Sequence, residues 1–250
     1  MELAGALDLG DREMVSFVGA GGKKTSMARL VEEGRSRRRV GYTTTTHMPP
    51  PDWLPVVVAT SDAIADRIEA AAAPLAFASQ RVENPARVDA KVKGFDPAAL
   101  DQLFAAELLD WIVVKADGAR MREFKAPGDG EPAIPQASTV VVPVVSAKIF
   151  GEPLDESVVH RPERVAAIAD VDLGTTITPT LVGTVLAHPA GGLKDVPDDA
   201  RVLAMLNKAD DETERDLARD ALRTAFDRSD RFAAGLVTSF EESFLETLQP

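Results

Sequence analysis

Short apolar runs of strand length alternate along the chain with longer segments in which apolar residues recur every three to four positions. This alternation predicts buried strands joined by helices, an arrangement typical of an α/β fold with a mostly parallel sheet. Strands are expected at residues 13–18, 40–43, 56–59, 74–77, 111–114, 139–145, 201–206 and 231–238. Helices are expected at residues 23–33, 61–72, 97–109, 161–169, 179–187 and 212–226.

Two segments do not follow the alternation. Residues 79–94 have weak periodicity, which predicts a loop or an edge hairpin. Residues 117–136 are rich in glycine, proline and charge, which predicts a long ordered loop of the functional kind. Because the chain has no internal repeat and no low-complexity linker, residues 1–250 are interpreted as a single α/β nucleotide-binding domain, with helices flanking one sheet.

Composition narrows the class of protein. The formal net charge of −12 argues against a nucleic-acid partner, because phosphate contacts need a basic face. No apolar run approaches the roughly 18 to 20 residues that span a bilayer, so no membrane association is expected. The chain has no cysteine and no signal-peptide pattern, which favours a cytoplasmic location. The acidic excess fits either adaptation to high salt or an ordinary acidic protein, and composition leaves both open.

A glycine-rich segment follows the first predicted strand. Its residues are Gly19, Ala20, Gly21, Gly22, Lys23, Lys24, Thr25 and Ser26. Glycines let backbone N–H groups approach an anion, and the following helix start adds a favourable dipole, so the segment predicts a P-loop-type phosphate site. It fits the short pattern Gly-x-x-Gly-Lys, with Lys24 where a magnesium-binding hydroxyl is expected and Thr25 and Ser26 next. The alternative is a tight turn with a basic helix start, although lysines there are unfavourable without an anion.

Two further polar segments follow predicted strands. Asp117 comes after the strand at 111–114, where a carboxylate beside a phosphate loop holds Mg²⁺ and its waters. The residues Asn207, Lys208, Ala209 and Asp210 follow the strand at 201–206 and read Asn-Lys-x-Asp, the guanine-reading pattern of GTP-binding proteins. In that pattern the aspartate accepts from guanine, the lysine stem covers the ring and the asparagine ties loops together. The alternatives are a helix cap or turn for Asp117 and a polar turn for the second segment.

A run of four threonines, residues 43–46, ends the second predicted strand and is followed by His47. Hydroxyls at this edge of the sheet face the same crevice and are suited to phosphate, metal or water. A β-branched strand that continues into a loop is the alternative. The three histidines lie in separate contexts, so no histidine metal cluster is expected.

Several segments together resemble the YqeC family, described as accessory proteins of selenium-dependent molybdenum hydroxylases. They span roughly residues 14–211, and their order is more specific than any one motif. The matching segments are Val18-Gly19-Ala20-Gly21-Gly22-Lys23, Thr43-Thr44-Thr45-Thr46-His47-Met48, Ala116-Asp117-Gly118-Ala119-Arg120, Lys125-Ala126-Pro127, Glu131-Pro132-Ala133-Ile134-Pro135, Gly151-Glu152-Pro153-Leu154, Val159-His160-Arg161-Pro162 and Leu206-Asn207-Lys208-Ala209-Asp210.

The resemblance implies a P-loop-type nucleotide-binding protein that helps mature a molybdenum hydroxylase, whose partners are the hydroxylase or its maturation proteins. Two departures from the family pattern bear on turnover. Lys24 replaces the usual threonine of Gly-Gly-Lys-Thr, and Lys115 replaces the usual glutamate before Ala-Asp-Gly. Nucleotide binding is therefore the firmer expectation, and hydrolysis the weaker one.

The leading hypothesis is a slow, Mg²⁺-dependent GTPase or GTP-dependent maturation factor, with ATP as the other possible ligand. The glycine segment would hold phosphates, Thr25 and Asp117 would manage Mg²⁺, and Asn207, Lys208 and Asp210 would read guanine. Asp117, Thr45, His47 and Lys125 would line the reacting face. The alternatives are a carrier that holds a nucleotide or pterin-dinucleotide cofactor without hydrolysis, and a kinase or nucleotidyl transferase acting on a cofactor precursor.

Overall fold

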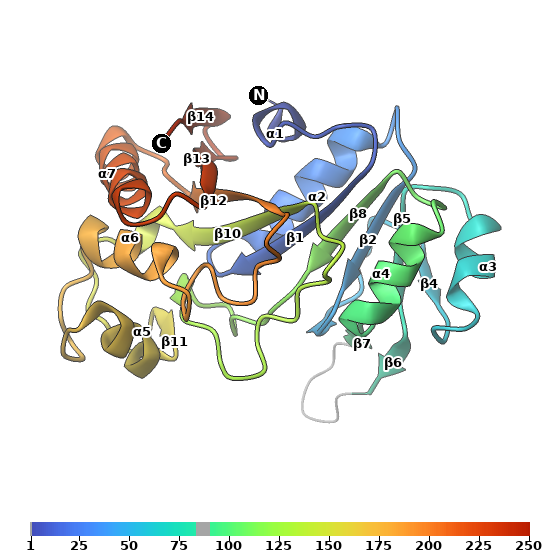
Figure 1. The fold of residues 1–250 in the computed structure, drawn as a ribbon, viewed down its shortest axis with the longest axis horizontal. Helices are drawn as coiled ribbons and strands as arrows, with labels where there is room; N and C mark the ends of the chain where they lie inside the picture. The colour runs from blue at the N-terminus through green and yellow to red at the C-terminus, as the bar shows by residue number, and fades with distance from the viewer. Residues whose placement is uncertain (1, 84–90) are drawn as a thin grey trace.

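The computed structural model describes residues 2–83 and 91–250. A nine-stranded sheet forms its centre, in the order β14-β13-β12-β10-β1-β8-β2-β5-β4 (Figure 1). The strands of this sheet are β1 (Glu13–Gly19), β2 (Val40–Thr44), β4 (Val56–Val58), β5 (Leu75–Ala78), β8 (Trp111–Lys115), β10 (Val140–Ser146), β12 (Arg201–Asn207), β13 (Phe232–Ser239) and β14 (Phe244–Leu248). The predicted α/β fold with a mostly parallel sheet flanked by helices is confirmed. That the whole chain is one domain stays a prediction.

One strand departs from the expected pattern. Residues 231–238 are predicted to be the last strand, but β14 follows β13 and pairs with it antiparallel, with Ser239 opposite Phe244. The prediction missed β14 because an edge strand is half-exposed and needs no continuous apolar run. In β14 the polar residues Glu246 and Thr247 interrupt the apolar ones, so the segment lacks the signature of a buried strand.

Helices cover both faces of the sheet. They are α1 (Leu3–Ala6), α2 (Lys23–Gly34), α3 (Ile64–Glu69), α4 (Pro97–Ala105), α5 (Pro162–Ala169), α6 (Pro179–Ala187) and α7 (Glu212–Arg228), with a 3₁₀ turn at Ala147–Ile149. On one face, α1 and α2 pack against alternate residues of β1 such as Val15 and Phe17. On the other face, α3 and α4 pack near one edge, and α6 and α7 pack near the opposite edge (Figure 1).

The two irregular segments form small sheets of their own. β6 (Gln80–Val82) and β7 (Lys91–Lys93) pair antiparallel within residues 79–94, and β3 (His47–Met48) joins β7. Residues 84–90 of that segment lie outside the described residues. The loop at 117–136 contains β9 (Phe124–Lys125), which pairs in parallel with β11 (Val159–His160). The antiparallel pair β6–β7 agrees with the hairpin expected as one option for residues 79–94. The two-residue strands β3, β9 and β11 leave no periodic pattern in the sequence, which explains why they were not predicted.

The order of the strands changes direction at β1. After β1 the chain crosses through α2 to β2 on the β8 side, and it later crosses from β8 to β10 on the other side. In open parallel sheets the crevice at such a switch point, outside the carboxyl ends of the strands, is where ligands bind. The glycine segment that follows β1 lies at this point.

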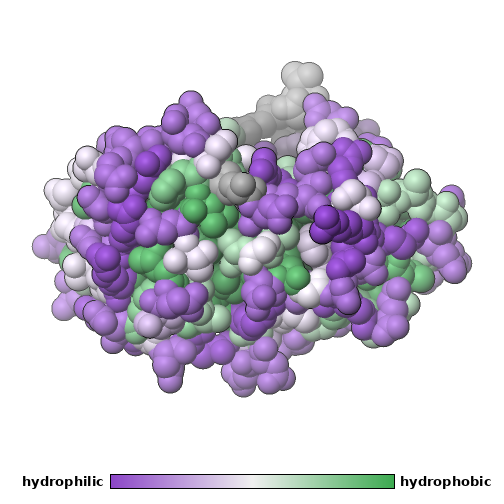
Figure 2. All heavy atoms as spheres, turned by 90° about the horizontal axis from the view of Figure 1, so that it is seen from above, coloured by the Kyte–Doolittle hydropathy of each residue, from purple (hydrophilic) through white to green (hydrophobic). Residues whose placement is uncertain are grey.

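The surface of the molecule is drawn from one side in Figure 2. The face seen in Figure 2 is mostly hydrophilic, and its hydrophobic residues lie in small groups among polar ones. Within the described ranges, none of the helices combines the length and the apolar character needed to cross a membrane.

Candidate functional site

The glycine segment wraps closely around the end of β10. Gly19, Gly21 and Gly22 have positive φ values of 87°, 84° and 118°, which side chains other than glycine rarely adopt. A Cβ at Gly19 would lie 2.3 Å from the carbonyl oxygen of Val144, and one at Gly21 would lie 2.3 Å from the amide nitrogen of Ser146. The backbone path therefore requires glycine both for its conformation and for its close approach to β10.

Asn207 fastens this segment to two other strands. Its Nδ2 donates to the carbonyl oxygen of Gly21 at 3.0 Å, and its Oδ1 accepts from the Thr238 hydroxyl at 3.0 Å. The same Nδ2 would lie 2.2 Å from a Cβ at Gly22. Asn207 thus connects the glycine segment with the carboxyl ends of β12 and β13.

Lys23, the first residue of α2, points back into the site and is buried. Its Nζ forms an ion pair with Asp117 Oδ1 at 2.6 Å and also donates to the carbonyl oxygen of Gly19. The amide of Gly19 donates to Asp117 Oδ2 at 2.8 Å. The anion that a basic helix start requires is supplied here by the protein's own carboxylate.

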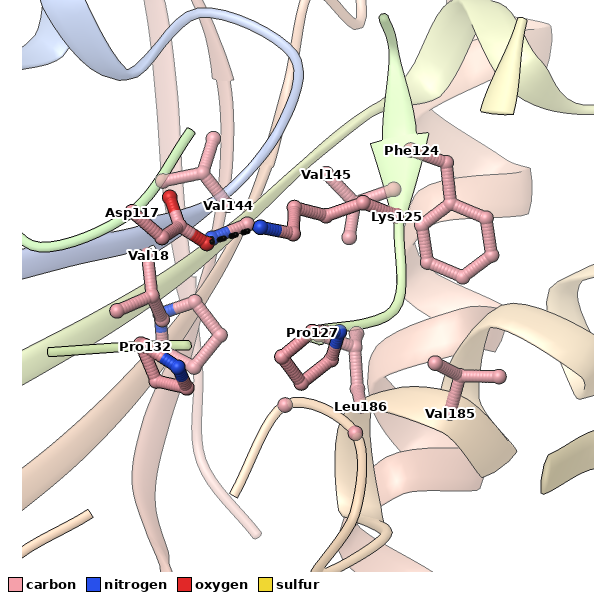
Figure 3. A pocket seen from close by; sticks show the side chains of 14 residues that line it. Val18, Asp117, Phe124, Lys125, Pro127, Pro132, Val144, Val145, Val185 and Leu186 are labelled. Carbon is pink, nitrogen blue, oxygen red and sulfur yellow. Dashed lines mark hydrogen bonds and ion pairs between the residues drawn. The ribbon is translucent and has the colours of Figure 1, made fainter. Parts of the chain in front are cut away.

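Asp117 begins a chain of charged groups, and Figure 3 shows its first contact, the one with Lys125. Lys125 lies 3.0 Å from Asp117 Oδ2 and 2.9 Å from Glu131 Oε2. Arg161 in turn contacts the same Glu131 oxygen at 2.8 Å. Because the chain alternates in sign, its buried members stabilise one another, and removing one leaves its neighbours uncompensated.

The neighbouring cationic groups keep the carboxyl groups of Asp117 and Glu131 ionised. Burial would raise the pKa of Asp117, but the charges of Lys23 and Lys125 outweigh burial and hold the pKa below its usual range. Burial likewise would raise the pKa of Glu131, but Lys125 and Arg161 bring it to about 2. Burial dominates at Lys23 and lowers the pKa of its ammonium group.

Lys115, at the end of β8, is the second buried lysine of the site. Its Nζ donates to Thr46 Oγ1 at 2.8 Å and to the carbonyl oxygen of His47 at 3.2 Å. Across the described part of the chain no carboxylate pairs with it. Burial, followed by the charge of Lys23, lowers the pKa of Lys115 to about 8.

Replacing Lys115 with methionine is expected to stabilise the folded protein by about 2 kcal/mol at pH 7, because the charge is buried without a carboxylate. Between about pH 8 and 10.5 the folded protein releases this proton before the unfolded chain does, so wild-type stability rises with pH. The gain from Lys115→Met therefore shrinks over that range. Urea unfolding at pH 7 and pH 10 measures it, with exposed Lys24→Met as the control. Equal stability of Lys115→Met and wild type at pH 7 would contradict the assignment.

The remaining polar residues at this edge have mixed environments. Thr45 Oγ1 is buried and has no hydrogen-bond partner within residues 2–83 and 91–250. His47 is exposed, and burial followed by the charges of Lys93 and Lys91 lowers its pKa. Both residues flank Lys115 rather than Lys23, since the backbone N–H of Thr45 donates to the Lys115 carbonyl oxygen at 3.1 Å. Their proposed roles stay predictions.

Residues 24–26 lie on the first turn of α2. Lys24 and Thr25 are exposed. Ser26 is buried, and its hydroxyl donates to the carbonyl oxygen of Gly22 at 3.3 Å. Ala20 is buried, and its amide donates to Val144 at 2.8 Å.

The Asn-Lys-x-Asp segment carries charges that are already paired. Asp210 Oδ1 accepts from the Ser239 hydroxyl at 2.7 Å, and Oδ2 lies 2.9 Å from Lys148 Nζ. Lys208 has a positive φ of 63° and pairs with Glu123 at 2.8 Å. Any base edge would have to compete with the Ser239 hydroxyl for the carboxylate of Asp210. Guanine reading thus stays a prediction, and it requires Asp210 to leave Ser239 and Lys148 for the base.

The carboxylate and histidine groups do not by themselves make a metal site. In the part of the chain that the structure describes, no three His, Asp or Glu residues lie close enough to hold a metal ion. Both Asp117 oxygens face cationic or N–H groups, namely Lys23, Lys125 and the Gly19 amide. This arrangement does not fit a resident Mg²⁺ ion held by Asp117 and Thr25.

A small pocket opens beside Asp117 and Lys125 (Figure 3). Apolar and glycine residues form most of its wall, including Val18, Phe124, Leu186 and Gly191. The pocket holds about 360 Å³ of empty space, part of it open to solvent. Because the ammonium group of Lys23 is buried and paired with Asp117, a phosphate reaches it only if that ion pair opens.

Sequence reasoning did not single out several residues that complete the site. Ser146 and Thr238 lie at the carboxyl ends of β10 and β13, so the rule that ligands gather at strand ends would have found them. Glu131 and Arg161 meet across 30 residues and belong to irregular segments. No local pattern in the sequence predicts that contact.

Comparisons with known proteins agree with the resemblance seen in the motifs. A family model described as YqeC protein matches residues 15–163. The chain is also similar to the uncharacterised protein YqeC of Escherichia coli (strain K12), with 33% identity over 208 residues, 81% of this chain and 79% of that protein. The matched region includes most of β1, the glycine segment, Asp117 and Arg161. The chain belongs to the YqeC family.

Proposed function

We propose that this protein binds a nucleoside triphosphate, with GTP as the preferred ligand, and places its phosphates against the glycine segment. The observation that carries the proposal is the buried Lys23 at the start of α2, behind three glycines with positive φ. Backbone N–H groups and a helix start favour an anion, and the lysine adds a charge that reaches the terminal phosphates.

The balance of charge in the site supports the same proposal. Lys23, Lys115 and Lys125 are only 6%, 9% and 5% exposed, whereas Asp117 is the one carboxylate at their centre and is 1% exposed. Glu131, at the rim, offsets one further charge. Burying an excess of ammonium groups costs stability, so the excess suggests a ligand that brings negative charge.

Binding would exchange one anion for another. In the free protein the carboxylate of Asp117 forms an ion pair with Lys23, and a phosphate group would replace that carboxylate as the partner of Lys23. The exchange would release Asp117 Oδ1, and an Mg²⁺ ion that arrives with the phosphates could then be held through water. We therefore expect magnesium to bind together with the nucleotide and not before it.

The preference for guanine is proposed from the Asn-Lys-x-Asp segment. Asn207 already ties it to the glycine segment, which places the two segments side by side at the carboxyl ends of the strands. The carboxylate of Asp210 would accept from guanine after leaving Ser239 and Lys148. Adenine presents a different pattern of donors and acceptors and would not satisfy this carboxylate.

Asp210→Ala is expected to reduce affinity for GTP about 10-fold to 100-fold while leaving ATP affinity nearly unchanged, because each charge-assisted hydrogen bond contributes about 1.5–3 kcal/mol. Calorimetric titration with GTP, ATP and CTP, with and without Mg²⁺, measures both the proposed binding and the preference. Asp220→Ala on α7 serves as the control, since Asp220 pairs at the surface with Arg223. Equal losses for GTP and ATP would refute guanine reading, and no binding of any triphosphate would refute the proposed function.

We infer further, from the family resemblance, that nucleotide binding serves maturation of a molybdenum-containing hydroxylase in the cytoplasm. A carrier that does not hydrolyse its nucleotide is the second candidate. It is favoured by Lys115, because an ammonium group bound to Thr46 and His47 stands where family members usually have a glutamate. Phosphate release from GTP distinguishes the two, since a carrier binds without release.

A further inference from the structure

A second polar hollow lies beyond Glu131, on the side away from Lys23. Its side chains are those of Arg120, Arg122, Glu156, His160, Arg161 and Glu163. They come from the loop that follows β8 and from the segment that enters α5. Three arginine residues therefore line one hollow on a protein whose formal net charge is −12.

The arginines differ in how they are held. Arg161 is fixed, because it contacts Glu131 at 2.8 Å and its guanidinium carbon lies 3.0 Å from where a Cβ on Gly128 would be. Arg120 and Arg122 have exposed side chains, and among the residues described neither forms a side-chain hydrogen bond or ion pair. Two donor-rich side chains thus line the hollow without a hydrogen bond to the described residues, and Arg122 also interacts electrostatically with Asp155.

The hollow carries charges of both signs, three arginines and two glutamates, and one of the arginines, Arg161, is paired with Glu131. Glu156 and Glu163 line it as well, but both are exposed and neither pairs with an arginine of the hollow in the described part of the chain. Burial, followed by the charges of Arg161, Lys125 and Arg120, lowers the pKa of His160. Arginine charges thus reach the imidazole of His160, which makes this ring a local probe of the hollow.

We propose that this hollow binds a phosphate group of a second ligand, separate from the phosphates on the glycine segment. The planar guanidinium fork matches two oxygens of a phosphate at once, and Arg120 and Arg122 are free to do so. The amino end of α5, which begins directly after Arg161, adds a favourable dipole. The proposal stands on this hollow alone and does not require that the glycine segment bind a nucleotide.

The position of the hollow suggests why a second phosphate would be held there. The ion-pair chain Arg161–Glu131–Lys125–Asp117 runs from the hollow to the partner of Lys23. A ligand anchored at the arginines would lie along this chain, close to the crevice at the end of β1. The second ligand is thus expected to be a phosphorylated small molecule that meets the nucleotide site.

Titration with inorganic phosphate at constant ionic strength, followed by proton NMR of the histidine rings, tests the proposal. The chain has three histidines, so their signals can be assigned with His160→Gln. We expect a saturable shift of the His160 signal and a rise in its pKa as phosphate binds. The double variant Arg120→Gln/Arg122→Gln should weaken this response at least 10-fold, whereas the charge-matched Arg223→Gln/Arg228→Gln in α7 should not.

The Lys23→Met variant separates the two sites. If the hollow is a site of its own, His160 responds to phosphate in Lys23→Met as it does in the wild type. A response that disappears with Lys23→Met would overturn the proposal, because the phosphate would then belong to the glycine segment. An equal response to sodium chloride, or an unchanged response in the double arginine variant, would also overturn it.

Discussion

Replacing Lys23 with methionine is expected to weaken nucleoside triphosphate binding about 100-fold or more. The ammonium group is the charge that the glycine segment places nearest to the proposed phosphates, and charge-assisted hydrogen bonds contribute about 1.5–3 kcal/mol each. A 100-fold loss corresponds to about 2.8 kcal/mol. Isothermal titration with GTP at fixed Mg²⁺ and salt measures the change.

The neighbouring Lys24 provides a matched control, because the same substitution there removes an exposed charge from the same helix turn. Lys24→Met is expected to change affinity less than about 5-fold, consistent with a screened surface charge. Equal losses in the two variants would mean that general electrostatic attraction, and not a positioned phosphate site, explains the binding. Far-UV circular dichroism establishes that both variants are folded.

Replacing Asp117 with asparagine is expected to lower the free energy of unfolding by about 3–5 kcal/mol at pH 7. The substitution leaves Lys23 and Lys125 buried without their shared counter-charge, the costly case for a buried ion pair. Because the pKa of Asp117 is depressed in the folded protein, the stabilisation is present above the unfolded pKa of about 4 and is lost as the pH falls through the folded pKa. Wild type and variant should therefore converge in acid.

Asp129 lies in the same loop and pairs with Arg164, but its side chain is 92% exposed. Asp129→Asn makes the same chemical change at the surface and should cost less than about 1 kcal/mol. Urea unfolding of both variants between pH 7 and pH 3 measures the comparison. If Asp117→Asn were no more destabilising than Asp129→Asn, the ion-pair chain would not be the structural centre of the site.

Local pattern was sufficient to predict the elements that are buried or strongly amphipathic. β8 was expected at 111–114 and spans Trp111–Lys115, and α6 was expected at 179–187 and spans those residues. The pattern failed for elements whose existence depends on tertiary partners. β14 needs the free edge of β13, and β9 needs β11 in a distant segment, so neither has a signature of its own.

For the candidate site, too, some residues could be predicted from local pattern, whereas the contacts between them could not. Asp117 and Asn207 could be placed at one edge with the glycine segment because each directly follows a buried strand. The sequence did not reveal that Lys23 pairs with Asp117, or that Glu131 joins Lys125 to Arg161. Such contacts depend on how a long loop lies on the sheet, and periodicity holds no information about that.

The burial of the lysines has a consequence for the speed of association. At long range, an anionic ligand encounters a molecule of formal net charge −12, and at low ionic strength this repulsion slows the encounter. Salt screens such distant charges over a Debye length of about 8 Å at physiological ionic strength, but it screens buried groups much less. Moderate salt would therefore raise the association rate of a nucleotide and lower its affinity by a smaller factor. At a basic surface patch, by contrast, salt lowers both the association rate and the affinity.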